Sequence, residues 1–157
     1  MSNSNPTPYE VLYRETVWPS LFALLPAILL APAVGLVITP FTDYVVATLV
    51  GSSVFVLALV VVLSLAPKIV VMQSDRKIFL QVNSANIEAS HISSVQVIAK
   101  REARAERGPK LDARSFRVFQ PSVSEMLKVN LSDERDSTPY WLVSTRNPVA
   151  LKAALKK

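Results

Sequence analysis

Two long segments without a charged residue, residues 16–42 and 44–67, constrain this chain more than any other feature of its sequence. Their most apolar stretches are residues 18–38 and 45–65. A helix rises about 1.5 Å per residue, so each stretch would span about 32 Å, close to the roughly 30 Å hydrocarbon core of a bilayer. The sequence therefore predicts two transmembrane helices.

The connection between these stretches, residues 39–44, is too short for anything but an antiparallel return, so residues 16–67 are expected to form a transmembrane hairpin. The connection carries Asp43 and no basic residue, whereas residues 68–157 contain 16 basic and nine acidic residues. Basic residues stay on the cytoplasmic side of membrane proteins. We therefore expect a two-pass protein of the bacterial plasma membrane with both termini in the cytoplasm.

Residues 1–15 begin with a small, polar, proline-containing composition, which predicts a flexible cytoplasmic tail. A secretory signal is the alternative, because Arg14 precedes an apolar stretch with a small-x-small pattern at 31–33. Glu10, Glu15 and the length of the apolar stretch favour the membrane helix.

Small residues recur at intervals of four in both apolar stretches. This spacing places them on one helix face, where they would let two backbones approach closely. Alanine is common, so chance explains the pattern as readily as packing does. If it reflects packing, the helix-packing residues are Ala27, Ala31, Gly35, Ala47 and Gly51. Neither stretch contains an ionisable residue, which disfavours a transporter or channel acting alone.

After residue 67, continuous apolarity gives way to short alternating runs, which are typical of strands with one buried face. The candidate strands are residues 69–72, 78–82, 87–90, 92–99, 116–120, 126–131 and 140–145. Asn147 as an N-cap and Pro148 in the first turn favour a helix over 148–156. The expected fold class is a membrane α hairpin followed by a small antiparallel β domain over residues 68–157. This arrangement is similar to a pleckstrin-homology-like (PH-like) split barrel with a C-terminal helix.

The most distinctive run, residues 136–148, reads DSTPYWLVSTRNP. Together with Tyr13-Arg14-Glu15 ahead of the apolar stretches, it resembles an actinobacterial family of membrane proteins, domain of unknown function 3093. The resemblance extends from Tyr13 to the end of the chain and implies a location and a fold, but no activity. Its most specific residues are Thr138, Pro139, Tyr140, Trp141 and Arg146.

Tyr140 and Trp141 are neighbours on a candidate strand and therefore point to opposite faces. One is expected in the core, and the other is expected on a binding surface or against the membrane.

A basic segment with interspersed acidic residues spans residues 100–110. Beside a membrane, each basic side chain would contribute about 1 kcal/mol of attraction to anionic lipid headgroups. The alternative is a solvated, charge-mixed loop or frayed helix. The candidate lipid contacts are Lys100, Arg101, Arg104, Arg107 and Lys110.

Composition removes whole classes of chemistry. The chain has no cysteine, a single histidine and three glycines, so thiolate metal sites, paired-histidine zinc motifs and glycine-rich phosphate loops cannot be built. His91 is expected to be structural or exposed, and the acidic cluster Asp133, Glu134 and Asp136 lacks calcium-loop spacing. No catalytic, cofactor or metal site is expected. No nucleic-acid partner is expected either, because no stacking platform accompanies the basic residues.

These observations favour a non-enzymatic, membrane-anchored interaction module at the inner leaflet that binds lipid headgroups or a membrane protein. The alternative is an accessory or structural subunit of a transporter or envelope-synthesis complex, in which the hairpin makes the essential contacts.

Overall fold

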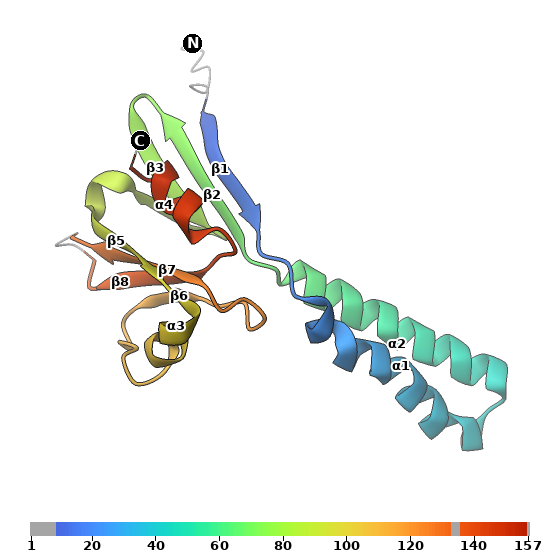
Figure 1. Cartoon of the computed structure of the whole chain (residues 1–157). Coiled ribbons are helices and arrows are strands. Elements are labelled where there is room, and N and C mark those ends of the chain that lie inside the picture. The colour runs from blue at the N-terminus through green and yellow to red at the C-terminus, as the bar shows by residue number, and fades with distance from the viewer. Residues whose placement is uncertain (1–8, 133–135, 157) are drawn as a thin grey trace, which may run out of the picture. The chain divides into compact units, whose positions relative to one another are not determined.

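A computed structural model describes residues 9–132 and 136–156, which divide into two compact units (Figure 1). The hairpin unit comprises residues 18–66. The sheet unit comprises the described residues up to Val17 together with those from Pro67 onward.

The hairpin unit contains two antiparallel helices. A 3-10 turn, Leu21–Leu24, leads into α1, Leu25–Ile38, and a second, Thr39–Phe41, follows it before α2, Tyr44–Ser64. Asp43 caps α2, because its carboxylate accepts a hydrogen bond from the backbone N–H of Val46 at 2.9 Å.

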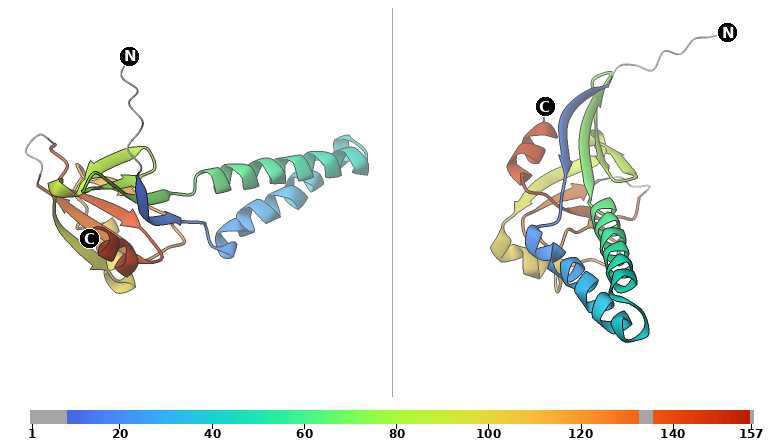
Figure 2. Two further views of the ribbon diagram at one scale, coloured as in Figure 1. Left: turned by 90° about the horizontal axis from the view of Figure 1, so that it is seen from above. Right: turned by 90° about the vertical axis from the view of Figure 1, so that its right-hand side faces the viewer.

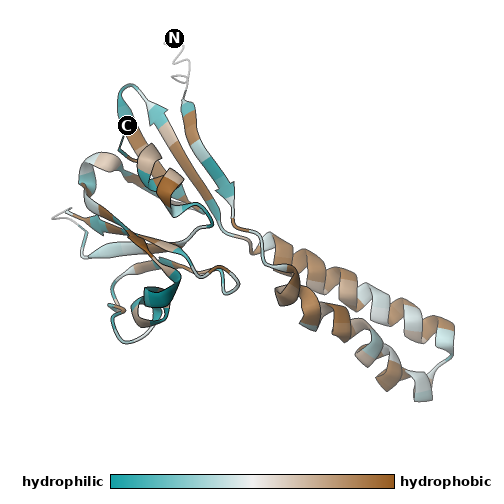
Figure 3. Ribbon diagram, in the orientation of Figure 1, coloured by the Kyte–Doolittle hydropathy of each residue, from teal (hydrophilic) through white to brown (hydrophobic). Residues whose placement is uncertain are grey.

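Both helical segments are long and apolar enough to cross a membrane, over Leu21–Phe41 and Tyr44–Ser64. Hydrophobic residues predominate along both helices, with less hydrophobic residues toward the connection (Figure 3). Only 6% of the most apolar window of the first segment and 11% of the second is buried. The core helix of a soluble protein would be mostly buried, whereas these helices present an apolar surface that the described residues leave uncovered.

The sheet unit contains two four-stranded sheets. The first has the order β1-β2-β3-β4 and the second the order β5-β7-β8-β6 (Figure 1). The strands are β1 Glu10–Thr16, β2 Lys68–Ser74, β3 Lys77–Val82, β4 Ala85–Glu88, β5 Ile92–Ile98, β6 Phe116–Val118, β7 Met126–Leu131 and β8 Tyr140–Ser144.

Strand β1 corrects the prediction that residues 1–15 form a flexible tail. It pairs antiparallel with β2 along its length, and Leu12, Tyr13 and Val17 pack in or against the core. Residues 1–8 lie outside the described part of the chain. The hairpin unit is therefore inserted between two paired strands, and residues 68–157 alone do not make up the sheet unit.

The second sheet corrects the expectation of a purely antiparallel domain, because β6 pairs with β8 in parallel. Strand β7 lies between β5 and β8 and is antiparallel to both. The chain therefore crosses from β6 at the edge to the interior position of β7, which leaves β6 running in the direction of β8.

The main core lies between the two sheets. Leu127, Val129, Trp141 and Val143 face Val71 and other residues of the first sheet. Helix α4, Pro148–Ala154, packs against β1, β5 and β7 and adds its own apolar face to this core (Figure 2).

Helix α3, Lys100–Arg107, covers the other face of the second sheet. There Ala103 joins Ile98, Met126, Tyr140 and Leu142 in a smaller core. Because β8 is covered on both faces, all five of its residues are buried.

Candidate functional site

The small residues singled out for helix packing lie along the contact between α1 and α2. Ala27, Ala47 and Gly51 are buried. A Cβ atom on Gly51 would lie 2.6 Å from the carbonyl oxygen of Ala31, closer than van der Waals contact allows. A Cβ atom on Gly35 would meet the Ala47 carbonyl oxygen at 3.7 Å, an ordinary contact. Gly51 thus sets the close approach of the two helices.

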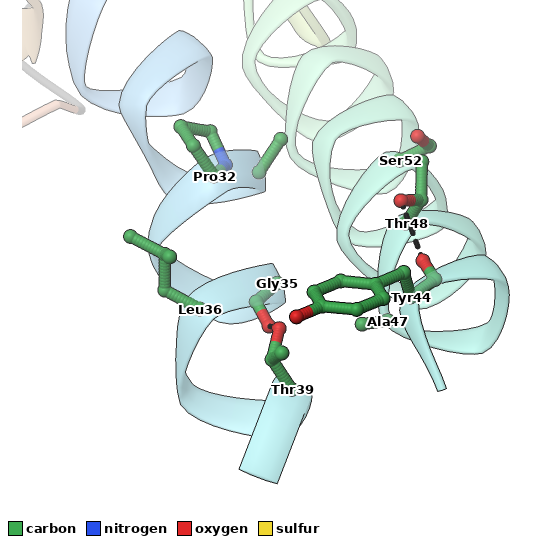
Figure 4. Close-up of a pocket in the computed structure, with 9 residues that line it drawn as sticks. Pro32, Gly35, Leu36, Thr39, Tyr44, Ala47, Thr48 and Ser52 are labelled. Atoms are coloured by element: carbon green, nitrogen blue, oxygen red, sulfur yellow. Dashed lines mark hydrogen bonds between the residues drawn. The ribbon is translucent and has the colours of Figure 1, made fainter. Parts of the chain in front are cut away.

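A pocket of about 370 Å³ lies beside this contact, and Figure 4 shows the Tyr44 ring reaching across it toward Gly35 and Thr39. The hydroxyl of Thr39 donates to the Gly35 carbonyl, and that of Thr48 donates to the Tyr44 carbonyl, both at 2.7 Å. No charged side chain lines this pocket. Its lining offers packing surface and internally bonded hydroxyls, and no acid–base chemistry.

The two chain ends that lead into the hairpin unit are fixed by hydrogen bonds within the sheet unit. The N–H of Val17 donates to the Pro67 carbonyl at 2.8 Å, and the Val17 carbonyl accepts from the buried Gln120 side chain at 3.1 Å. Lys68 exchanges two bonds with Asn83, through its N–H at 2.9 Å and its carbonyl at 2.8 Å. Val17 is therefore held by Gln120 in the loop after β6, and Lys68 is held by Asn83 in the β3–β4 turn.

Near this junction, the Glu15 carboxylate joins β1 to the segment that follows β8. The hydroxyls of Tyr13 and Thr145 both donate to its Oε2 atom, at 2.6 and 2.5 Å. The backbone N–H of Arg146 donates to Oε1 at 2.8 Å. Burial, together with the hydrogen bond to Glu15, raises the pKa of Tyr13 to about 12. Residue patterns did not identify this cluster, although both of its halves lie in the runs that carry the family resemblance.

The other residues that carry the family resemblance have structural roles. Tyr140 and Trp141 point to opposite faces as predicted, but both are buried, which corrects the expectation that one forms a binding surface. Trp141 packs against Phe116 in the main core in a tilted arrangement, with ring centroids 4.5 Å apart and the ring planes at 46°. The Tyr140 hydroxyl accepts from the Asp112 N–H at 2.8 Å. Thr138 and Pro139 lead into β8, where the Pro139 carbonyl accepts from the Leu131 N–H.

Residues 100–107 of the basic segment form helix α3, whose two faces differ, and residues 108–110 form a turn after it. Glu106 is buried and bonds Lys128 at 2.9 Å, with Lys110 at 3.9 Å from its other oxygen. Arg107 turns inward and donates to the Val123 carbonyl and, at 3.2 Å, to the Ser144 hydroxyl. Arg107 is therefore not the freely exposed contact that the sequence suggests.

Lys100, Arg101 and Arg104 remain exposed on the outer face of α3. A groove of about 490 Å³ runs between α3 and the loop before β7. Its polar lining comes from Lys100, Arg104, Arg107 and Ser124. Arg101 and Lys110 lie outside it.

The remaining candidates contribute no site. His91 lies in the 3-10 turn Ala89–His91, where its carbonyl accepts from the N–H of Ser132. Asp136 accepts from the N–H of Thr138, while Asp133 and Glu134 lie outside the described residues. Among residues 9–132 and 136–156, no three metal-ligating side chains cluster closely enough to hold an ion.

Comparison with known proteins identifies a family. The profile of a family described as a protein of unknown function (DUF3093) matches residues 12–155. No curated protein and no solved structure matches the chain significantly. The family match includes both halves of the Glu15 cluster, the hairpin unit and the basic segment.

Proposed function

Since the chain belongs to the family described as DUF3093, whose description names no activity, we propose a function from the structure itself. The protein is a non-enzymatic, membrane-anchored interaction module that holds its sheet unit at the inner face of the plasma membrane.

The apolar surface of the hairpin unit carries this proposal. Large side chains on both helices are strongly exposed, including Leu21, Leu36 and Leu57. An apolar surface this extensive is unstable in water and favourable in lipid. The hydroxyls of Thr48, Ser53 and Ser64 donate to carbonyls of their own helix, which reduces their cost in hydrocarbon.

Charge supports the orientation. Asp43 is the single charged residue in the connection between the helices, residues 39–44. The sheet unit, in contrast, contains the exposed basic residues of α3. The positive-inside rule then favours a cytoplasmic sheet unit and an external connection. We further propose that the sheet unit is PH-like, because two sheets enclose one core and a C-terminal helix packs between them.

The outer face of α3 is the proposed contact for anionic lipid headgroups, through Lys100, Arg101 and Arg104. Catalysis is not part of the proposal. The Thr145 hydroxyl, which donates to the Glu15 carboxylate beside the Tyr13 hydroxyl, is completely buried and cannot reach a substrate.

The test is extraction of membranes at alkaline pH, which removes peripheral proteins and leaves integral ones. The full chain should remain in the membrane pellet, whereas a variant in which residues 18–66 are replaced by a two-residue turn should be soluble. Release of the full chain would contradict membrane anchoring.

A second candidate is an accessory subunit whose hairpin binds a membrane helix of a larger complex. The observation that favours it is an apolar groove of about 480 Å³ along α2, lined by Leu49, Val56, Leu57 and Val60 with Ser52 and Ser53. Val56→Trp should fill this groove. The variant should then lose copurification of a partner in mild detergent, while the full chain stays in the membrane.

A further inference from the structure

The groove beside α3 gathers positive charge that no carboxylate of the described residues neutralises. Its three cationic side chains are Lys100, Arg104 and Arg107, and no acidic residue lines it. The nearby Glu106 is engaged by Lys128 and Lys110. Glu125 lines the neighbouring groove beside α4, which Lys100 also lines, and it forms no ion pair with a described residue. An anion entering this groove would meet three cationic side chains and no carboxylate in the lining.

Arg107 is held in place by neutral groups. Its Nε atom donates to the Met126 sulfur at 3.2 Å, and its Nη2 atom donates to the Val123 carbonyl and the Ser144 hydroxyl. The guanidinium also lies over the Phe119 ring, 5.4 Å from its centroid. Burial lowers the pKa of Arg107, because these contacts do not replace water or a counter-charge in full.

The remaining donors face no partner. The Nη1 atom of Arg107 makes no hydrogen bond to any described residue, and neither do the side chains of Lys100, Arg104 and Ser124. The free Nη1 atom of a fixed guanidinium, two exposed cationic side chains and a hydroxyl therefore line one groove. Arginine forks and a hydroxyl donor match the geometry of a tetrahedral oxyanion.

We propose that the groove formed by Lys100, Arg104, Arg107 and Ser124 is a binding site for a phosphate group. Arg107 supplies the fixed donors, while Lys100 and Arg104 close over the phosphate from the same helix. Ser124 donates from the facing loop. This goes beyond the proposed function, because a phosphate group in this groove requires no membrane, and its source is either a lipid headgroup or a soluble phosphate compound.

The test uses the full chain in micelles of dodecyl maltoside, which contains no phosphate. Inorganic phosphate is titrated calorimetrically at constant ionic strength, with sodium chloride as the reference. We expect saturable binding that weakens about tenfold in Arg104→Gln and in Lys100→Gln, since each variant removes one charge-assisted hydrogen bond.

Arg117→Gln is the control, because Arg117 is an exposed arginine of β6 that lies outside the groove, so the variant removes the same charge elsewhere. Its affinity for inorganic phosphate should stay within about twofold of the parent. An equal loss in Arg117→Gln, or no saturable binding by the parent chain, would overturn the proposal. Arg107→Lys should weaken binding while preserving the cation, and an unchanged affinity in that variant would also contradict the site.

The same titration in nanodiscs distinguishes the two sources of phosphate. Phosphatidic acid in the disc should weaken the apparent affinity for inorganic phosphate if a lipid headgroup occupies the groove. An unchanged affinity assigns the groove to a soluble phosphate compound and removes lipid headgroups from the proposed function. Membrane anchoring is measured separately by alkaline extraction, so failure of either proposal leaves the other open to its own test.

Discussion

At the scale of single residues, Glu15 links β1 to the segment after β8 by hydrogen bonds. Its carboxylate accepts from the side chains of Tyr13 and Thr145 and from the backbone of Arg146. Because Thr145 is completely buried, loss of the Glu15 carboxylate would leave the proton of its hydroxyl without an acceptor, while the hydroxyl oxygen would still accept from the N–H of Asn147.

Glu15→Gln should therefore destabilise the sheet unit by about 1–3 kcal/mol, since it removes the charge and turns one acceptor atom into a donor. The measurement is thermal or chemical unfolding of the full chain in detergent. Glu10→Gln is the control, because Glu10 lies on the same strand and is exposed. Similar effects of the two substitutions would mean that the Glu15 cluster contributes nothing beyond strand charge.

The raised pKa of Tyr13 also gives a prediction about pH. Its pKa is about 12 in the folded chain, against about 10 in an unfolded one. The neutral phenol is thus favoured by folding, so its contribution is fully present below about pH 10 and is lost as pH rises toward 12. The free energy of unfolding measured across this pH range should fall more steeply in the parent than in Tyr13→Phe. Parallel curves would contradict the assignment.

At the scale of elements, the approach of α1 to α2 depends on Gly51. Gly51→Ala places a Cβ atom 2.6 Å from the Ala31 carbonyl oxygen, and backbone must move to relieve the clash. We expect a loss of about 1–3 kcal/mol, typical of overpacking. Gly35→Ala is the matched control, because its new Cβ atom meets ordinary contact at 3.7 Å. Thermal stability in detergent should separate the two variants, and an equal loss would contradict this packing.

Local patterns allowed most elements to be predicted from the sequence. Strand β7 begins and ends at the predicted residues 126 and 131, because alternation along one strand is visible in the strand itself. Helix α2 lies within one residue of the predicted stretch 45–65, because a long apolar run is also visible in the segment itself. Strand β1 was missed because its partner β2 lies beyond the whole hairpin unit, so its pairing is nonlocal.

The candidate site was less predictable, because a charge run does not tell which side chains face inward. The relevant signal was helical spacing. Ala103 and Arg107 are four residues apart and share the face of α3 that packs on the sheet. The Glu15 cluster could not be derived, since it joins residues separated by nearly the whole chain.

At the scale of the whole molecule, the hairpin unit is an insertion in the sequence between β1 and β2, two strands that pair with each other in the sheet unit. Val17 and Pro67 are already hydrogen-bonded, and Thr16 pairs with Lys68. Replacing residues 18–66 by Asn-Gly should turn β1 and β2 into an ordinary hairpin and yield a soluble, folded sheet unit. A dispersed amide NMR spectrum and a cooperative melt are the expected observations.

Residues 68–157 alone should behave differently. This fragment lacks β1, the buried Val17 side chain and the Glu15 acceptor, so we expect it to be unfolded or aggregated under the same conditions. If it folds as well as the Asn-Gly variant, β1 is not an essential part of the sheet unit.

The central claim, a sheet unit held at the inner face of the membrane by a two-helix hairpin, is tested most directly by cysteine labelling. The chain contains no cysteine, so single substitutions report without background from the protein itself. In intact cells, a membrane-impermeant maleimide should label Thr42→Cys in the connection and should label Ser137→Cys in the sheet unit only after permeabilisation. Labelling of Ser137→Cys in intact cells, with Thr42→Cys protected, would contradict the account.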